Sequence, residues 1–180
     1  MATPILAAAL GCGHGTTKEH HGATAAHHGA TAGHHPSGPV RPDSALERVA
    51  AIHGGTGPFA VAGYRMGERA LRELGAERGS FDLEVVHESP PRVQWSCIAD
   101  GLQAATGTSP GRLNLKLVEV SRDRASSVVR NRRTGKAVTF TLTPAFLDRW
   151  KDLPSDQNAA AGAEVMRLAD HEIFEITLAS

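Results

Sequence analysis

The sequence has few cysteines, few aromatic residues and no excess of charge of either sign. Its 180 residues include two cysteines, and 4% of them are aromatic. Two cysteines exclude both a disulfide framework and a zinc site built from four thiolates. Nineteen basic and nineteen acidic residues give a formal net charge of zero, so charge gives no reason to expect a polyanionic partner. We therefore expect no nucleic acid among the partners.

Long hydrophobic runs are also absent. The apolar stretch from Ile5 to Leu10 is far shorter than the roughly 20 residues that a membrane-spanning helix needs, so we expect no transmembrane segment. The stretch leads into Gly11-Cys12, which looks like the end of a bacterial lipoprotein signal, where a cysteine receives lipid. If Cys12 is lipidated, the protein is an exported, periplasmic lipoprotein. Otherwise it is cytoplasmic, and the sequence leaves both open.

Residues 1–42 form a low-complexity leader that is rich in histidine. A seven-residue unit starts at His20 and again at His27, and a third histidine pair starts at His34. Its alanine, glycine, threonine and histidine offer too little apolar area to offset the entropy of ordering, so we expect disorder. Imidazole nitrogens bind zinc and nickel, which makes the pairs predicted metal ligands. They are His20, His21, His27, His28, His34 and His35. The alternative is a repeat-expanded linker with no cellular role in metal binding.

Residues 43–180 have the periodicities of a folded α+β domain. Ser44 and Glu47 predict a capping box for a first helix that ends at His53, and Pro58 and Gly75 mark the start and end of a longer helix. A third helix follows Pro90-Pro91, and two more are expected over residues 145–153 and 159–169. Strands are predicted at residues 81–85, 113–117, 127–130 and 137–142, with an extended segment at 171–176. The predicted fold is a mainly antiparallel sheet packed with helices, in one domain behind the leader.

Two features of the predicted helices indicate close packing and a site. Gly63 and Gly67 lie one turn apart in the second helix and weaken it, which suggests that another backbone packs closely on that side. Cys97 and Asp100 lie three residues apart on the third helix, so both can point at the same spot. A lone cysteine can equally be a small buried hydrophobe, and an aspartate can hydrogen-bond a turn.

Several blocks of the domain resemble, in the same order, the FmdE family of formylmethanofuran dehydrogenase proteins. The blocks are Ile52-His53-Gly54 with Pro58, Gly63-Tyr64-Arg65-Met66-Gly67, residues 97–103, Thr106-Gly107 with Gly111 and Asn114-Leu115, residues 131–136 and residues 170–175. The family's name links it to one-carbon metabolism. The resemblance implies an α+β core that forms a homodimer and gathers histidine and cysteine side chains at a metal-binding pocket. It therefore implies zinc or nickel, held by His53 and Cys97.

The chain departs from the family at the loop after the first helix. The family's loop usually reads His-Gly-His-x-Cys-Pro-Gly, whereas this chain has His53-Gly54-Gly55-Thr56-Gly57-Pro58-Phe59. One histidine and one cysteine are thus missing, and His53, Cys97 and Asp100 survive. Three ligands of nitrogen, sulfur and oxygen type would suit zinc with an open fourth position, if the fold brings His53 to the cysteine helix.

Three functions are compatible with these residues. The one we favour is a non-catalytic metal-binding accessory protein, whose histidine arm collects a divalent ion and whose core holds it or docks it to a client protein. The second is a zinc- or cysteine-dependent enzyme that uses His53, Cys97 and Asp100, which a lowered thiol pKa would favour. The third is a module that binds a small ligand in a degraded metal site. The residues expected to line that site are Tyr64, Trp95, Asp100 and Asn114.

Overall fold

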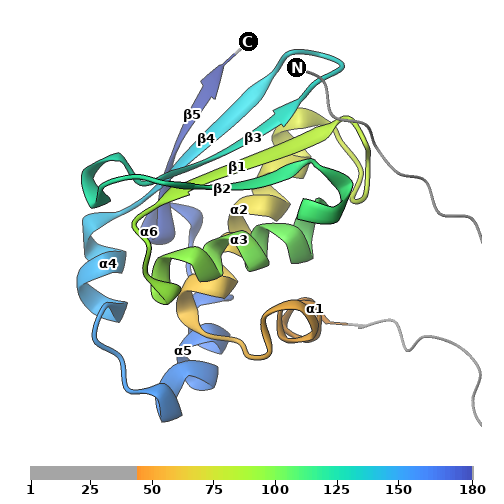
Figure 1. Ribbon diagram of the computed structural model, residues 1–180. Coiled ribbons are helices and arrows are strands. Elements are labelled where there is room, and N and C mark those ends of the chain that lie inside the picture. Colours follow the sequence, from red (N-terminus) through yellow and green to blue (C-terminus); the bar gives the residue numbers. More distant parts are fainter. Residues whose placement is uncertain (1–43, 180) are drawn as a thin grey trace, which may run out of the picture. The chain divides into compact units, whose positions relative to one another are not determined.

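The computed structural model describes residues 44–179, in which helices cover one face of a sheet (Figure 1). The leader's histidine pairs, its expected disorder and Cys12 lie outside the described residues. Within residues 44–179 no helix combines the length and the apolar character needed to cross a membrane. The α+β class predicted from the sequence is confirmed.

Local signals in the sequence define the first three helices. α1 (Ala45–His53) starts after Ser44, whose hydroxyl accepts from the Glu47 amide while the Glu47 carboxylate accepts from the Ser44 amide. The predicted capping box therefore forms. α2 (Pro58–Leu74) has proline at its first position, where the missing N–H would have no partner, and ends at a left-handed Gly75. α3 (Val93–Thr106) follows the two prolines and ends at a left-handed Gly107.

Five strands form one sheet in the order β2-β1-β3-β4-β5. Their bounds are β1 (Leu83–Ser89), β2 (Leu115–Glu119), β3 (Ser126–Asn131), β4 (Ala137–Leu142) and β5 (Phe174–Ala179). β1 runs parallel to β2, with α3 in the crossover that a parallel pair requires. The other neighbours are antiparallel, which confirms a mainly antiparallel sheet.

Several predicted boundaries are wrong because polar residues hide the period of the structure. β1 runs past the predicted residues 81–85 because His87 and Ser89, although polar, face the core. The extended segment expected at residues 171–176 begins instead as a helix, α6 (Asp170–Ile173), whose Glu172 carboxylate accepts from the Ala169 amide. Two predicted helices are shorter than expected, namely α4 (Pro144–Trp150) and α5 (Asn158–Val165). Three short 3-10 turns are η1 (Pro110–Arg112), η2 (Arg122–Arg124) and η3 (Ser155–Gln157).

α2 and α3 approach each other so closely that both need glycine. A methyl group on Gly63 would lie 2.1 Å from the carbonyl oxygen of Ile98, and one on Gly67 would lie 2.5 Å from Cβ of Ala105. The expected close packing of a backbone against these glycines is therefore confirmed, and the backbone is α3 of the same chain. Because α3 occupies this side, the two glycines give no support to the expected homodimer, which stays a prediction.

His87 is buried between the sheet and α3. Its Nε2 donates to the Trp95 carbonyl at 3.0 Å, so Nδ1 of the neutral ring accepts from the Ser127 hydroxyl at 2.8 Å. Met66 and Phe140 lie on other sides of the same space. Burial lowers the pKa of His87 below its ordinary value of 6.5, although the Trp95 carbonyl favours the charged form. A neutral imidazole therefore joins α3 to β1 and β3.

His87 should make the stability of the domain depend on pH. Because the pKa is lowered in the folded state, the unfolded state takes up the proton first as the pH falls below about 6.5. The free energy of unfolding should decrease from there until folded His87 is itself protonated. In His87→Gln the amide can donate to Trp95 and accept from Ser127, so the slope between about pH 6.5 and 5 should flatten in urea titrations. An unchanged slope would assign the effect to another group.

Candidate functional site

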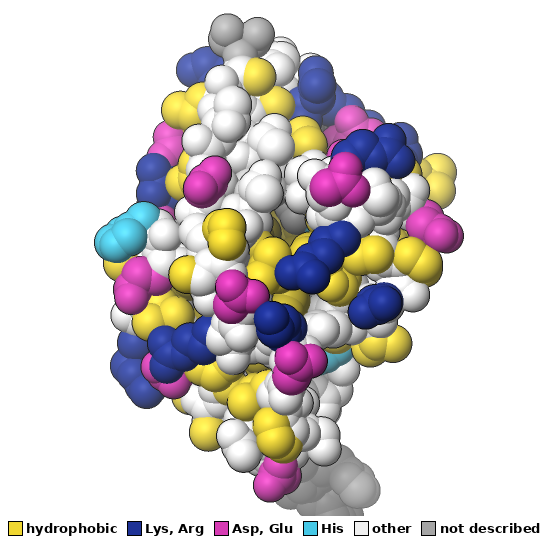
Figure 2. Space-filling model, turned by 90° about the vertical axis from the view of Figure 1, so that its left-hand side faces the viewer, with side chains coloured by type: hydrophobic (Ala, Val, Ile, Leu, Met, Phe, Trp, Pro, Cys, Tyr) yellow, Lys and Arg dark blue, Asp and Glu magenta, His cyan; other side chains and the backbone are white. Residues whose placement is uncertain are grey.

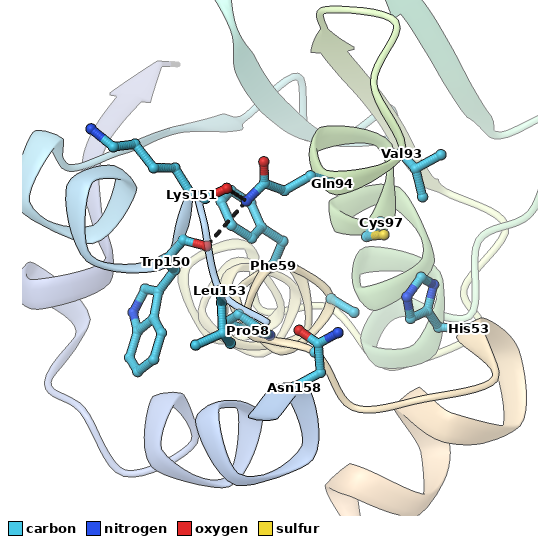
Figure 3. A pocket seen from close by; sticks show the side chains of 12 residues that line it. His53, Pro58, Phe59, Val93, Gln94, Cys97, Trp150, Lys151, Leu153 and Asn158 are labelled. Carbon is cyan, nitrogen blue, oxygen red and sulfur yellow. Dashed lines mark hydrogen bonds between the residues drawn. The ribbon is translucent and has the colours of Figure 1, made fainter. Parts of the chain in front are cut away.

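A pocket of about 330 Å³ opens between the start of α2, the first turns of α3 and the segment after α4 (Figure 3). Phe59, Val93 and Leu153 give it an apolar wall, and His53 and Asn158 add polar groups. Figure 2 shows apolar side chains gathered in a hollow on the side where α4 lies, with basic and acidic side chains around it. Apolar walls with a few polar groups are typical of sites for small molecules.

The first turn of α2 forms one wall of this pocket. Gly57, the N-cap residue, has no side chain to cap the helix, and it lines the pocket together with Pro58, Phe59 and Ala60. The amides of Phe59 and Ala60 belong to the first turn, where no intrahelical acceptor exists. They also lie at the positive end of the helix dipole. The pocket therefore has backbone hydrogen-bond donors beside its apolar side chains.

Gln94 connects the two sides of the pocket. From the first turn of α3 its side-chain amide donates to the carbonyl oxygens of Trp150 and Lys151, at 3.1 and 2.8 Å (Figure 3). These residues end α4 and begin the loop that follows it. The hydrogen bonds thus hold the α4 side at a fixed distance from α3 and keep the pocket open between them.

His53 and Asp100 form a hydrogen-bonded pair across α1 and α3. Nδ1 of His53 lies 2.9 Å from Oδ2 of Asp100. A carboxylate can only accept, so Nδ1 carries a proton and Nε2 of the neutral ring keeps its lone pair. His53 also lines the pocket, so the fold does bring this residue to the cysteine helix. The pair sets the tautomer with which His53 can meet a ligand.

Cys97 lines the same pocket from α3, on the side where His53 lies (Figure 3). Burial raises the pKa of its thiol to about 11, and the negative charge of Asp100 adds to the effect. Nearly all of the thiol is therefore protonated at pH 7 to 8. A cysteine nucleophile needs the opposite shift, because the thiolate is the reactive form.

Alkylation of Cys97 should consequently be slow. In a Cys12→Ser background Cys97 is the single thiol. Iodoacetamide at pH 8 should modify it roughly 100-fold more slowly than a free thiol of ordinary pKa, because the thiolate fraction is lower by about that factor. Asp100→Asn removes the nearby charge and should raise the rate. A rate like that of a free thiol would refute the raised pKa, and mass spectrometry measures either outcome.

The described part of the chain contains no group of three His, Cys, Asp or Glu side chains placed to hold a metal ion together. His53 and Cys97 offer two donors at the pocket, and the Asp100 carboxylate accepts from His53 Nδ1. This set falls short of the three protein ligands that a zinc site with an open position requires. His53 and Cys97 as metal ligands stay a prediction.

Three other residues expected at the site lie elsewhere. Tyr64 is buried, and its hydroxyl accepts from Arg48 at 2.7 Å. Trp95 is buried in the core, and Asn114 is buried with its amide bonded to two backbone groups. None of the three lines the pocket within the described residues. Their contact with a ligand stays a prediction.

Several side chains that line the pocket were not expected from the sequence. They are Gln94, Trp150, Lys151, Leu153 and Asn158. They come from α3, from the loop after α4 and from the start of α5, and no short motif joins these segments. One signal was available: Gly57-Pro58 predicts an uncapped helix start, which commonly lies beside a polar ligand.

Comparisons with known proteins agree with the fold. The model of the family described as "FmdE, Molybdenum formylmethanofuran dehydrogenase operon" matches residues 52–175. The chain is also similar to a solved structure, an FmdE-like protein of tungsten formylmethanofuran dehydrogenase from Syntrophus aciditrophicus. The TM-score is 0.53 and the identity 18%, covering 74% of this chain and 69% of that chain. At that identity the likeness shows the fold alone. No curated protein gives a match.

Proposed function

This chain belongs to the FmdE family, and from that premise we propose that it is a non-catalytic accessory protein whose FmdE-like domain binds a small organic ligand beside His53 and Cys97. The observation that carries the proposal is the pocket itself. Its volume of about 330 Å³ is within the range of small-molecule sites, and its lining is apolar with a few convergent polar groups.

The lining defines the chemistry of the ligand. Its apolar part would pack against Phe59, Val93 and Leu153. Because Asp100 holds the proton of His53 on Nδ1, the remaining nitrogen of the neutral ring accepts, so the ligand would present an N–H or O–H group to it. The backbone donors at the start of α2 would suit a carbonyl or carboxylate oxygen. The proposed ligand is thus small, partly apolar, and both a donor and an acceptor.

The same geometry supports binding over catalysis. A general base or nucleophile needs a pKa matched to its task, and the pKa of the Cys97 thiol is raised away from neutrality. The protonated thiol can still donate a weak hydrogen bond or pack against a ligand. Cys97 is therefore proposed as part of the binding wall.

Metal binding is assigned in this proposal to the leader. Its three histidine pairs offer six imidazoles within sixteen residues, enough to surround a zinc or nickel ion. The core offers only the two donors His53 and Cys97 at its pocket. We propose that the leader buffers or delivers a divalent ion for a client protein, while the core recognises the organic ligand.

Metal content of three full-length variants tests this division. Replacing the six leader histidines by alanine should abolish most zinc and nickel binding in elemental analysis and calorimetry. His53→Ala with Cys97→Ser should leave it nearly unchanged. Gly55→His with Gly57→Cys restores the family's loop pattern at positions that have room for both side chains, and should add a site. If the His53 and Cys97 variant loses the ion instead, the core is the metal site.

A blocked pocket tests the organic ligand. Val93 is 79% exposed and lines the pocket, so Val93→Trp should obstruct it without disturbing the core. Leu178→Trp, at a 62% exposed position in β5, is the matched control. Ligand-observed NMR with a library of small amides and carboxylic acids should give hits that Val93→Trp weakens at least tenfold and Leu178→Trp does not. Hits that ignore both substitutions would place binding outside the pocket.

A further inference from the structure

Basic and apolar side chains meet at the end of the sheet where β1 and β2 begin and β3 ends. Figure 1 shows the segment before β1, the turn η1 before β2 and the β3–β4 hairpin at this same end. We call this surface the basic end. It consists of Arg78, Phe81, Arg112, Leu113, Arg132 and Arg133, and none of them lines the pocket.

The apolar members of the basic end are strongly exposed. Phe81 is 70% and Leu113 is 81% exposed. Leu113 is also the one non-glycine residue with positive φ in the described chain, at 55°. This conformation is strained for a leucine, and strained residues cluster where a protein binds its partners. Burial cannot explain the choice of leucine here, because the side chain lies almost wholly in solvent.

The turn that holds Leu113 is itself firmly fixed. The Leu113 amide donates to the Pro110 carbonyl at 2.9 Å. The next residue, Asn114, is fully buried, accepts from the Ser109 amide and donates to the Leu83 carbonyl, at 3.0 Å each. The strained leucine is thus presented by a turn anchored to the sheet, so little conformational entropy would be lost when a partner covers it.

The guanidinium groups are held mostly by neutral acceptors. Arg112 donates to the carbonyls of Gly107 and Gly79, at 2.6 Å each, and its carbon lies 4.0 Å from the centre of the Phe81 ring. Arg132 donates to the Phe81 carbonyl and Arg78 to that of Ala104. Carbonyl groups orient a guanidinium without cancelling its charge.

Carboxylates compensate little of this charge. Among residues 44–179, Arg133 is the one arginine of the basic end that has a carboxylate partner, Asp82 at 3.1 Å, and both side chains are exposed. Oriented positive charge around exposed apolar groups matches the composition of protein interfaces, where arginine and aromatic residues are enriched.

We propose that the basic end is a docking surface for a protein partner that receives Leu113 and Phe81 in an apolar hollow rimmed by aspartate and glutamate. A second copy of this chain does not fit, because two basic ends would oppose like charges. A nucleic acid fits less well, because the aliphatic Leu113 has no ring on which a base can stack. Docking here would leave the pocket accessible, so one domain could serve a ligand and a client together.

Photocrosslinking in the cells of origin tests the proposal. Benzoylphenylalanine at position 113 of the full chain should yield an adduct with one protein, attached at a peptide rich in Asp and Glu. The same probe at Val93, which is 79% exposed, is the control for exposure alone. Arg132→Glu with Arg133→Glu should reduce the adduct at least tenfold. Arg122→Glu with Arg124→Glu, a second exposed pair of arginines, should not.

Leu113→Gly separates docking from folding. Glycine adopts positive φ without strain, so this variant should unfold at the same or a higher temperature than the wild type. Its affinity for the purified partner should nevertheless fall at least tenfold. An adduct with nucleic acid or with a second copy, no adduct above the Val93 control, or unchanged affinity of Leu113→Gly would each overturn the proposal.

Discussion

Gly63→Ala and Gly101→Ala should each lower the free energy of unfolding by about 2–3 kcal/mol, although alanine is the better helix former. A methyl group on Gly101 would lie 1.9 Å from the Ala60 carbonyl oxygen, and one on Gly63 would lie 2.1 Å from that of Ile98. Both neighbours are backbone atoms of a facing helix, so relief requires the two helices to separate. Urea unfolding followed by circular dichroism measures the loss.

Two further glycines provide the controls. A methyl group on Gly55 has nothing within 4 Å, so Gly55→Ala should change the free energy of unfolding by less than about 0.5 kcal/mol. Gly67→Ala would meet Cβ of Ala105 at 2.5 Å, a side-chain atom that can be removed. Ala105→Gly should therefore recover much of the stability that Gly67→Ala loses. Equal stability of Gly63→Ala and the wild type would contradict the steric argument.

The sequence predicted this packing only in part, for a physical reason. Gly63 and Gly67 recur one turn apart, and that spacing indicates a close approach on one face of a helix. Gly101 is a single glycine, which by itself can mean a weak point as well as a contact. Which helix lies opposite depends on tertiary packing, which no local pattern encodes. The helix ends were easier, because the Ser44 cap, Pro58 and Gly75 act through their own backbone.

The pocket illustrates the same limit. Cys97 and His53 could be named from the sequence because each belongs to a recognisable block. Trp150 and Asn158 could not, since a helix end and a helix start became neighbours only through folding. Buried polar residues misled in the other direction. Asn114 suggested a ligand contact, but its amide holds the turn before β2.

The loop after α1 links the family pattern to the pocket. At the two positions where the pattern has its second histidine and its cysteine, this chain has Gly55 and Gly57. Gly57 lines the pocket, and a methyl group there would meet Asn158 at an ordinary 3.5 Å. The space is therefore free of a side chain that the fold could accommodate. This favours a pocket adapted to an organic ligand over a metal site lost by steric conflict.

The block Gly63-Tyr64-Arg65-Met66-Gly67 serves more than one neighbour. Its two glycines contact α3, while Tyr64 and Met66 point into the core. Arg65 reaches the other way, to the end of α5 and to α6. One turn of α2 thus organises both sides of the domain, and Arg65 should be its most sensitive polar member.

Arg65→Met should lower the free energy of unfolding by about 3 kcal/mol. The guanidinium donates to the carbonyls of Val165 and Met166, at 3.0 and 2.9 Å, and to the Asp170 carboxylate at 2.7 Å. Its removal leaves those acceptors, in part-buried positions, without this donor. Both side chains of the ion pair are about four-fifths buried, so solvent screens it weakly. Arg65→Lys should recover only part of the loss, because an ammonium group cannot reproduce the fork of a guanidinium.

Lys116→Met is the matched control, because it breaks an ion pair with Glu84 in which Lys116 is 60% exposed. It should cost less than about 1 kcal/mol. Burial alone would raise the pKa of Asp170, but hydrogen bonds from Arg69 and Arg65 outweigh it and lower that pKa. The contribution of Asp170 should therefore be present above about pH 4 and fade as the pH falls further, whereas Asp170→Asn should lack this dependence. Equal losses in Arg65→Met and Lys116→Met would show that α5 and α6 do not depend on the Arg65 contacts.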